Sequence, residues 1–381
     1  MFKITVFESL VKRNSNFFSF FLYVWYASDM GDFVNKRALI AMSGGVDSAA
    51  AALLMQDAGY ECIGATMKLI ANGGSKCCSL EDINDARAAA WKLGIPHYVL
   101  NYTGDFTRHV IEPFIESYGR GETPNPCIEC NRHLKFSLLL RRARELEAQT
   151  LVTGHYAQIE KSGDRWLLKK GIDPHKDQSY VLYMMDQDAL SRTAFPLGTL
   201  TKAAVRELAA ARGLGNAEKE ESQDICFVDH GDYADFIESY TGKSSPSGDI
   251  TDTEGNILGR HRGLIRYTLG QRRGLGVAYN TPIYAAAKNI ETNTLIVGDE
   301  SSLYSKSFTA HHINLIACET LPPQRIKVKV RYLQKEQWAL AEQIDPDTIR
   351  VVFEEPQRAV TPGQAAVLYD GDIVIGGGTI C

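Results

Sequence analysis

The sequence lacks the features expected of a membrane or secreted protein. Its longest apolar run, residues 17–26, has ten residues, about half of what a helix needs to cross a bilayer. Eight cysteines in 381 residues are too few and too unevenly spaced for a disulfide framework. We therefore expect a reducing, cytoplasmic location and no membrane partner.

An excess of basic residues is also lacking. The chain has 41 Lys and Arg against 46 Asp and Glu, a net charge of −5 at pH 7. Bulk charge bears on solubility and leaves local basic faces possible, so it neither predicts nor excludes a nucleic-acid partner. We find no internal repeat, and the length fits two or three domains.

The first 29 residues differ in composition from the rest of the chain. The aromatic run 17–26 follows Lys12 and Arg13, as in a signal peptide, although it is short of arginine for a mitochondrial one. We interpret residues 1–29 as a spurious extension, with Met30 as the true start. A targeting tail is the alternative.

The remaining chain divides into three parts. In residues 30–193, apolar runs alternate with helical patterns, which predicts an α/β domain with a doubly wound parallel sheet. The runs are 38–42, 62–67, 98–100 and 151–153, and the helical patterns are 48–58, 80–93, 106–118 and 134–147. Residues 194–247 predict a small, mostly helical middle domain. Residues 248–381 contain short β-type runs between turn residues and predict an all-β barrel.

A glycine-containing loop joins the first predicted strand to the first predicted helix. Its residues are Ser43, Gly44, Gly45, Val46, Asp47 and Ser48. Adjacent glycines let the backbone approach a ligand, and the free N–H groups at a helix start bind anionic oxygens, which favours a nucleotide. The loop lacks the lysine of a Walker A motif, and Asp47 would repel phosphates unless Mg²⁺ intervenes. It resembles the SGGxDS loop of the ATP pyrophosphatase (PP-loop) superfamily.

A second group of reactive residues is the segment 123–131, which contains two prolines, Cys127 and Cys130. The prolines fix the path of the loop, and the dipole of the following helix favours a thiolate at Cys130. Cys130 is therefore a candidate nucleophile. Cys226 lies far along the chain, so sulfur chemistry shared by Cys130 and Cys226 requires a long loop closure.

Several motifs together resemble the tRNA-specific 2-thiouridylases (MnmA/TrmU family). They are SGGVDS, TPNPxxxCN, GHY at 154–156, KDQSY at 176–180, SQDICF at 222–227, YTLGQRRGLG at 267–276 and TPGQ at 361–364, in the family's order. The resemblance runs from about Arg37 to Gly378. It implies a PP-loop, HUP-like enzyme that uses ATP to replace the C2 oxygen of the tRNA wobble uridine with sulfur.

The resemblance also implies a role for individual residues. The nucleotide contacts would be Ala41, Met42, Ser43, Gly44, Gly45, Val46, Asp47, Ser48, Met67 and Gly154. The contacts to the target base or tRNA would be Asn125, Pro126, Cys127, His155, Lys176, Asp177, Gln178, Arg331, Tyr332 and Gln364. Cys226 would carry sulfur as a persulfide, and Cys130 would attack it, leaving a Cys130–Cys226 disulfide. The implied cofactors are ATP and Mg²⁺, and the implied partners are tRNAs for Lys, Glu and Gln and a cysteine desulfurase or sulfur-relay protein.

One departure from the family pattern opens an alternative. Cys127 stands where many members have aspartate, so Cys127, Cys130 and Cys226 could hold a [4Fe-4S] cluster with one open iron site. Zinc fits less well, because no fourth ligand has an obvious spacing. Cys77 and Cys78 could supply further ligands, although adjacent cysteines are more often packing residues.

Two rival functions remain. An amidating PP-loop enzyme would share the loop but have no use for paired catalytic cysteines. A noncatalytic sulfur-carrier or RNA-binding protein would have no need for an intact loop with Asp47. The sequence does not indicate the oligomeric state or the sulfur donor.

Overall fold

The computed structural model describes residues 36–71, 80–214, 225–228 and 232–381. The predictions about residues 1–29 and about Cys77 and Cys78 lie outside these residues. No helix in the described part of the chain is both long and apolar enough to cross a membrane.

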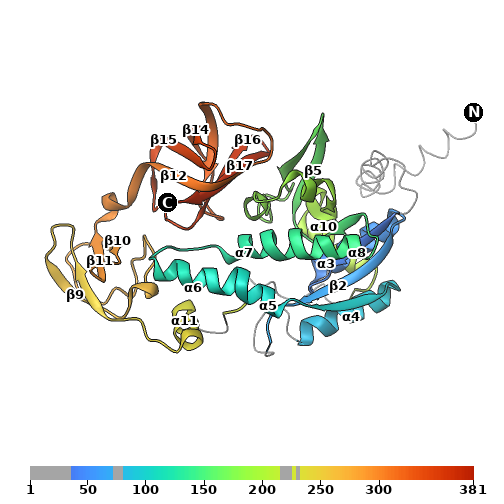
Figure 1. Cartoon of the computed structure of the whole chain (residues 1–381), viewed down its shortest axis with the longest axis horizontal. Helices are drawn as coiled ribbons and strands as arrows, with labels where there is room; N and C mark the ends of the chain where they lie inside the picture. Colours follow the sequence, from blue (N-terminus) through green and yellow to red (C-terminus); the bar gives the residue numbers. More distant parts are fainter. Residues whose placement is uncertain (1–35, 72–79, 215–224, 229–231) are drawn as a thin grey trace, which may run out of the picture.

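The N-terminal part is built on a five-stranded parallel sheet with the order β3-β2-β1-β4-β7 (Figure 1). The strands are β1 (Arg37–Ala41), β2 (Glu61–Lys68), β3 (His97–Asn101), β4 (Thr150–Val152) and β7 (Thr193–Ala194). Strand β1 lies centrally and is almost fully buried, as its continuous apolar sequence predicts. The predicted parallel sheet is therefore confirmed.

Helices connect and cover these strands. They are α3 (Val46–Asp57), α4 (Leu80–Leu93), α9 (Gln187–Ser191) and α10 (Lys202–Ala211), with the short turns η3 (Ser179–Leu182) and η4 (Pro196–Thr199). Two longer helical stretches follow β3: α5 (Thr103–Phe106), η1 (Thr107–Ile111) and α6 (Glu112–Gly119), and then α7 (Pro126–Glu129), η2 (Cys130–Leu139) and α8 (Leu140–Glu145). The alanines of α3 are buried and let this helix pack closely against the sheet.

The chain from residue 248 onward is all-β, as predicted, but forms two separate sheets. The first has the order β10-β11-β8-β9 and is accompanied by α11. Its elements are α11 (Tyr233–Thr241), β8 (Gly248–Thr251), β9 (Ile257–His261), η5 (Leu264–Arg266), β10 (Tyr284–Asn289), β11 (Thr294–Gly298) and η6 (Glu300–Leu303). Its small core includes Ile250, Leu295 and Val297. The predicted barrel thus begins after this sheet, because turn spacing reveals strands but not which strands pair.

The C-terminal part is a closed barrel. Strands β12-β15-β14-β13-β16-β17 pair in that order, and a β12–β17 pairing closes the ring. They are β12 (Tyr304–Leu315), β13 (Gln324–Lys329), β14 (Gln337–Asp345), β15 (Thr348–Arg358), β16 (Ala365–Asp370) and β17 (Ile373–Ile380). A hairpin of β5 (Ala157–Ser162) and β6 (Arg165–Lys170), which follows β4 in sequence, extends this sheet from β17.

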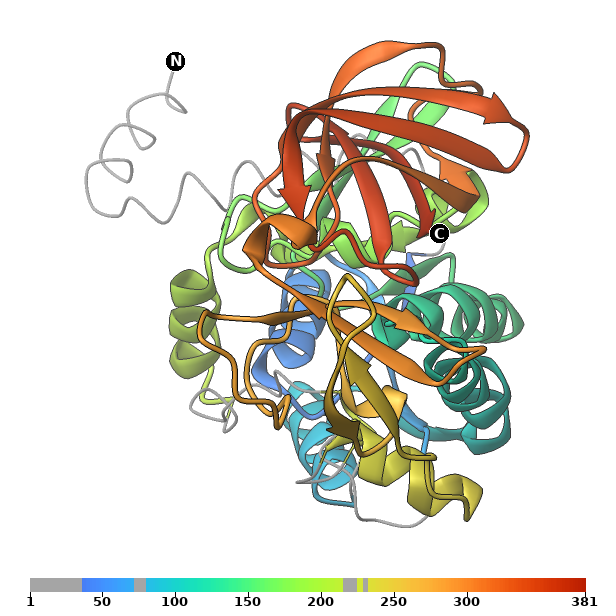
Figure 2. The ribbon, with the colours of Figure 1, turned by 90° about the vertical axis from the view of Figure 1, so that its left-hand side faces the viewer.

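These parts are arranged around the two long helical stretches. The barrel lies above α7–α8 and the small sheet lies at the far end of α6 (Figure 1). The turned view shows the barrel above the N-terminal part with the small sheet in front of it (Figure 2). The segment between α6 and α7 therefore lies where the three parts meet.

Candidate active site

The predicted phosphate loop is present between β1 and α3. Ser43 N donates to Ser48 Oγ (3.2 Å), and Ser48 Oγ donates to Gly45 O (3.0 Å), which closes the loop tightly. Gly44 has a φ of +81°, and a Cβ placed there would lie 2.4 Å from Asp82 O. Only glycine fits this position. The loop therefore exposes backbone donors at the start of a three-turn helix, an arrangement suited to phosphate oxygens.

The carboxylate of Asp47 is held by two residues from other parts of the chain. Lys202 Nζ lies 2.8 Å from both carboxylate oxygens, and the Tyr156 hydroxyl donates to Oδ1 (2.8 Å). The Lys202 side chain is only 9 % exposed and begins α10, where Thr201 caps the helix. The loop lacks the lysine of a Walker A motif, but Lys202, 155 residues downstream, places an ammonium group next to Asp47.

Sequence reasoning missed Lys202 and the contact from Tyr156. Lys202 lies in the first turn of a helix, and from that position alone we would expect its charge to face solvent. Nothing local pairs it with Asp47, because the contact depends on how α10 packs against α3.

Two further strand ends meet the loop, as predicted from the sheet topology. A Cβ on Gly154 would lie 2.9 Å from the carbonyl carbon of Asp47, so Gly154 packs directly against the loop. Thr66, near the end of β2, donates its hydroxyl to Met42 O (2.8 Å). Met67 follows and is buried. The ends of β1, β2 and β4 therefore meet at the phosphate loop.

His155, the residue after Gly154, is buried. Its Nδ1 lies 2.6 Å from Thr153 Oγ1 and its Nε2 lies 3.4 Å from Lys135 Nζ. Burial, and secondarily the charge of Lys135, lower the pKa of His155 well below its ordinary value of 6.5. The ring is therefore neutral at pH 7. Because the Lys135 ammonium can only donate, Nε2 accepts, and Nδ1 carries the proton toward Thr153.

The cysteine-containing loop leads into α7. Asn125 caps this helix by accepting from Cys127 N (3.1 Å), and Pro126 occupies its first turn. Cys127 is exposed, whereas Cys130 is 9 % exposed and belongs to the main apolar cluster. Cys130 thus lies one turn into the helix, as predicted.

Cys226 packs against the same apolar cluster as Cys130. The neighbouring Phe227 makes edge-to-face contacts with Phe106 and Phe114, at centroid distances of 5.7 and 5.1 Å. Cys130 and Cys226 thus belong to or contact one large apolar cluster. That they share sulfur chemistry stays a prediction. Within the described ranges, no group of three His, Cys, Asp or Glu side chains is placed to hold a metal ion.

Several predicted tRNA contacts join the barrel to the N-terminal part. Asp177 accepts from Gly171 N and from Ser179 N and Oγ, and Gln178 Oε1 accepts from Tyr156 N (3.0 Å). The Tyr332 hydroxyl donates to Asp177 O (3.2 Å). Lys176 opens this loop and is partly exposed.

Arg331 makes comparable links within the C-terminal half of the chain. Its Nη2 donates to Leu269 O, Ala359 O and Thr361 Oγ1, and burial lowers its pKa. Gln364 Nε2 donates to Thr123 O (2.7 Å), just before the cysteine loop. In this structure both side chains hold protein backbone in place.

The fold and the loop define the class of protein: a HUP-type nucleotide-binding domain followed by two β-domains. Family models match in the same order. They are the tRNA methyl transferase HUP domain (residues 36–230), the tRNA methyl transferase PRC-barrel domain (234–299) and the aminomethyltransferase β-barrel domain (305–380).

Curated relatives identify the family within this class. Proteins named tRNA-specific 2-thiouridylase MnmA share 47 % identity in Acetivibrio thermocellus (91 % of this chain, 99 % of the relative) and 45 % in Clostridioides difficile (91 % and 99 %). The relative of that name from Moorella thermoacetica shares 48 % (90 % and 98 %). The chain belongs to the tRNA-specific 2-thiouridylase family.

Proposed function

We propose that the chain is an ATP-dependent tRNA-uridine 2-sulfurtransferase that acts on the wobble uridine. The single observation that carries this proposal is the pairing of an intact phosphate loop with two cysteines that pack on one apolar cluster. An amidating enzyme has no need for the second feature. A noncatalytic carrier has no need for the first.

The phosphate loop would bind ATP and support adenylation of the uracil. The N–H groups at the start of α3 would hold the phosphates, with Met67 and Gly154 near the nucleoside. The C2 oxygen of uracil attacks the α-phosphorus, and pyrophosphate leaves. Lys202 would offset the charge of the leaving pyrophosphate, because its ammonium already lies at the loop.

The Asp47 carboxylate is the candidate ligand for Mg²⁺, since this ion usually takes one or two carboxylates together with phosphate oxygens. The side chain is 28 % exposed, so an incoming ion can reach it, although it would have to compete with Lys202. Such an ion would neutralise phosphate charge.

Sulfur delivery would use the two cysteines in turn. Cys226 would carry a sulfane sulfur as a persulfide, received from a cysteine desulfurase or a sulfur-relay protein. The Cys130 thiolate attacks the Cys226 sulfur, which forms a Cys130–Cys226 disulfide and releases hydrosulfide. Hydrosulfide attacks C2 of the adenylated uracil and AMP leaves. A dithiol reductant then returns both cysteines to thiols.

The tRNA would approach the loop that contains Asn125, Pro126 and Cys127. A wobble base must leave its stack to present C2, and a single-stranded loop permits this at low cost. We propose His155, Lys176, Asp177, Gln178, Arg331 and Tyr332 as the further family-derived contacts, and tRNAs for Lys, Glu and Gln as substrates. A cytoplasmic location and the domain bounds given above stay predictions.

The test is thiolation of unmodified tRNA with ATP, cysteine and a cysteine desulfurase, with 2-thiouridine and AMP measured by mass spectrometry. Wild type should form both, and tRNA with cytidine at the wobble position should yield neither. Cys226→Ser should release pyrophosphate, measured in a coupled phosphate assay, but form no 2-thiouridine, because AMP leaves only when hydrosulfide attacks C2. Cys318→Ser is the matched control, because Cys318 is also half-buried but lies near the barrel.

Two outcomes would contradict the scheme. No thiolation by the wild type would overturn the proposed function. Sustained turnover of Cys226→Ser with sulfide as donor, together with stoichiometric iron in anaerobically purified protein, would replace the persulfide route by a [4Fe-4S] cluster held by Cys127, Cys130 and Cys226.

A further inference from the structure

The barrel is hydrogen-bonded to the chain just before the cysteine loop. Gln364 Nε2 donates to Thr123 O (2.7 Å), and Thr123 N donates to Pro362 O (2.9 Å). Thr123 and Gln364 are 241 residues apart in the sequence. A single residue of the N-terminal part therefore has both of its backbone polar groups satisfied by one barrel loop, residues 361–364.

The barrel loop fits this segment closely. Gly363 has a φ of +86°, and a Cβ placed there would lie 2.9 Å from Glu122 Cβ and 3.0 Å from Thr123 N. Glycine is needed both for the backbone conformation and for the close approach. The contact is thus a shaped interface between two backbones, and no side chain at residue 363 could be accommodated.

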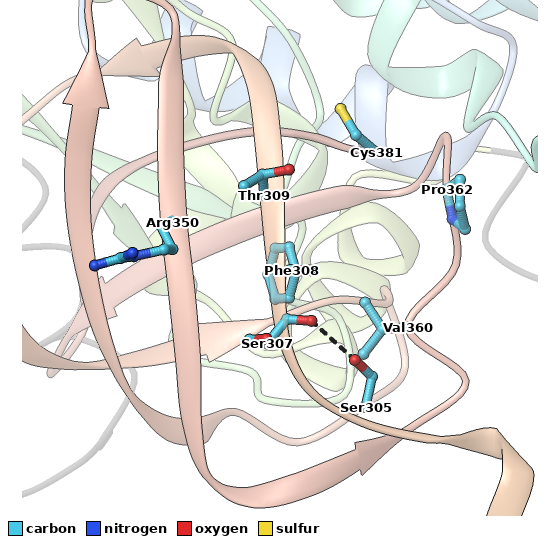
Figure 3. A pocket seen from close by; sticks show the side chains of 8 residues that line it. All are labelled: Ser305, Ser307, Phe308, Thr309, Arg350, Val360, Pro362 and Cys381. Atoms are coloured by element: carbon cyan, nitrogen blue, oxygen red, sulfur yellow. Dashed lines mark hydrogen bonds between the residues drawn. The ribbon is translucent and has the colours of Figure 1, made fainter.

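The barrel loop is itself anchored from behind. Gly363 N donates to Ile380 O (2.9 Å), and Ile380 N donates to Gln364 O (2.8 Å), which ties the loop to the last strand. Val360 and Pro362 border a pocket next to β12 (Figure 3), and Val360 also packs against the barrel core.

The same segment is held from its other side by the small sheet. Gly121 has a φ of +81°, and a Cβ there would lie 2.6 Å from Ile290 Cδ1. Arg120 and Glu122 on either side form an ion pair (2.8 Å). Residues 120–123 therefore lie between the small sheet and the C-terminal barrel.

The position of Thr123 is transmitted to the cysteines by a stiff connection. Pro124 and Pro126 have fixed φ angles, and Asn125 between them caps the helix that contains Cys127 and Cys130. Few torsions can absorb a displacement at Thr123 before it reaches the helix start. A shift of about 1 Å in reacting groups can lower a rate about a hundredfold.

We propose that Gln364 is a positioning residue: through its bond to Thr123 O, the barrel sets the placement of the cysteine loop for sulfur delivery. This inference rests on the proposed role of Cys130 as the thiol that attacks the persulfide. It differs from a direct contact of Gln364 with tRNA, because here the amide acts on the protein backbone. Adenylation, which occurs at the phosphate loop, does not depend on this contact.

The test compares Gln364→Ala with wild type in single-turnover reactions at saturating tRNA. The thiolation rate should fall by about tenfold or more, within the range that misplacement of reacting groups produces. Pyrophosphate release, which reports adenylation, and the dissociation constant for tRNA should each stay within about threefold of wild type, a change under 1 kcal/mol. Alkylation of Cys130 by iodoacetamide, mapped by mass spectrometry, should become faster, because the loop that buries it is released.

Two further variants make the outcome decisive. Gln334→Ala is the control, since Gln334 bonds Gln357 within the same barrel and does not contact the loop; it should leave all four readouts unchanged. Gly363→Ala keeps the Gln364 amide but forces the two backbones apart, so it should reproduce the effects of Gln364→Ala. It therefore tests the proposal even if Gln364→Ala folds poorly.

The proposal would be overturned by a weaker tRNA affinity with an unchanged thiolation rate at saturation, which is the pattern of a direct tRNA contact. Wild-type rates in both Gln364→Ala and Gly363→Ala would overturn it equally. Failure of the proposed function is separate: it would appear as full thiolation by Cys130→Ser with Gln364 intact.

Discussion

Replacing Lys202 with methionine tests the most unexpected contact of the site. The substitution keeps the length of the side chain and removes the ammonium that lies 2.8 Å from both Asp47 oxygens. Removing one partner of a fully buried ion pair costs about 3–5 kcal/mol. The cost here should be lower, about 2 kcal/mol, because Asp47 is 28 % exposed and keeps the hydroxyl of Tyr156.

The measurement is the free energy of unfolding in urea, combined with a double-mutant cycle. Lys202→Met and Asp47→Asn should each destabilise the protein, and the double variant should show a coupling energy of about 1–2 kcal/mol. Lys92→Met is the control, because Lys92 is exposed and its ammonium contacts the carbonyl of Gly213, beyond the other end of α10 from Lys202. That change should stay within about 0.5 kcal/mol.

The same variant separates a structural from a functional role. If Lys202 also offsets phosphate charge, AMP formation by Lys202→Met should fall about a hundredfold even in protein that is fully folded at the assay temperature. Strict additivity in the cycle would refute the ion pair. Wild-type AMP formation would refute the phosphate role while leaving the ion pair intact.

Three other outcomes follow from individual residues. The folded state lowers the pKa of His155, so below about pH 6.5 the unfolded chain binds a proton that the folded chain does not, and the stability of the wild type falls toward acid. His155→Gln should remove up to about 1.4 kcal/mol per pH unit of this fall. An equal loss of stability between pH 7 and pH 5 in wild type and variant, measured by urea unfolding, would contradict this prediction. Burial raises the pKa of Cys62 to about 12, so iodoacetamide at pH 8 should label exposed Cys127 and spare Cys62. Equal labelling of the two cysteines would contradict the burial of the Cys62 thiol. Gly44→Ala should cost about 1–2 kcal/mol and abolish nucleotide binding, since its Cβ would meet Asp82 O; unchanged ATP affinity would be inconsistent with this loop.

The central elements were predictable because their signals are local. The helix predicted at 80–93 is α4 with the same bounds, and the run 38–42 became β1 within one residue. The phosphate loop was equally accessible, since two glycines between an apolar run and an alanine-rich helix leave little choice of backbone. These predictions depend on periodicity and steric freedom, which a short segment carries by itself.

What the sequence could not predict are the contacts between distant segments. The hairpin of β5 and β6 follows the parallel sheet in sequence, yet pairs with β17 of the barrel. Lys202 carries no local sign of its pairing with Asp47. The amide of Gln364 donates to Thr123 O, a contact that no local sequence pattern predicts. In each case the partner is chosen by tertiary packing, and no local pattern encodes it.

The two cysteines illustrate how such packing serves the proposed chemistry. Lengthening a chain closure costs little, about 0.6 kcal/mol for each doubling, so the long connection to Cys226 is a small penalty. Burial of Phe227 between Phe106 and Phe114 contributes about 2 kcal/mol, which corresponds to a preference of roughly thirtyfold for the docked position. A preference of this size holds Cys226 at the cluster shared with Cys130 and is still small enough to be reversed.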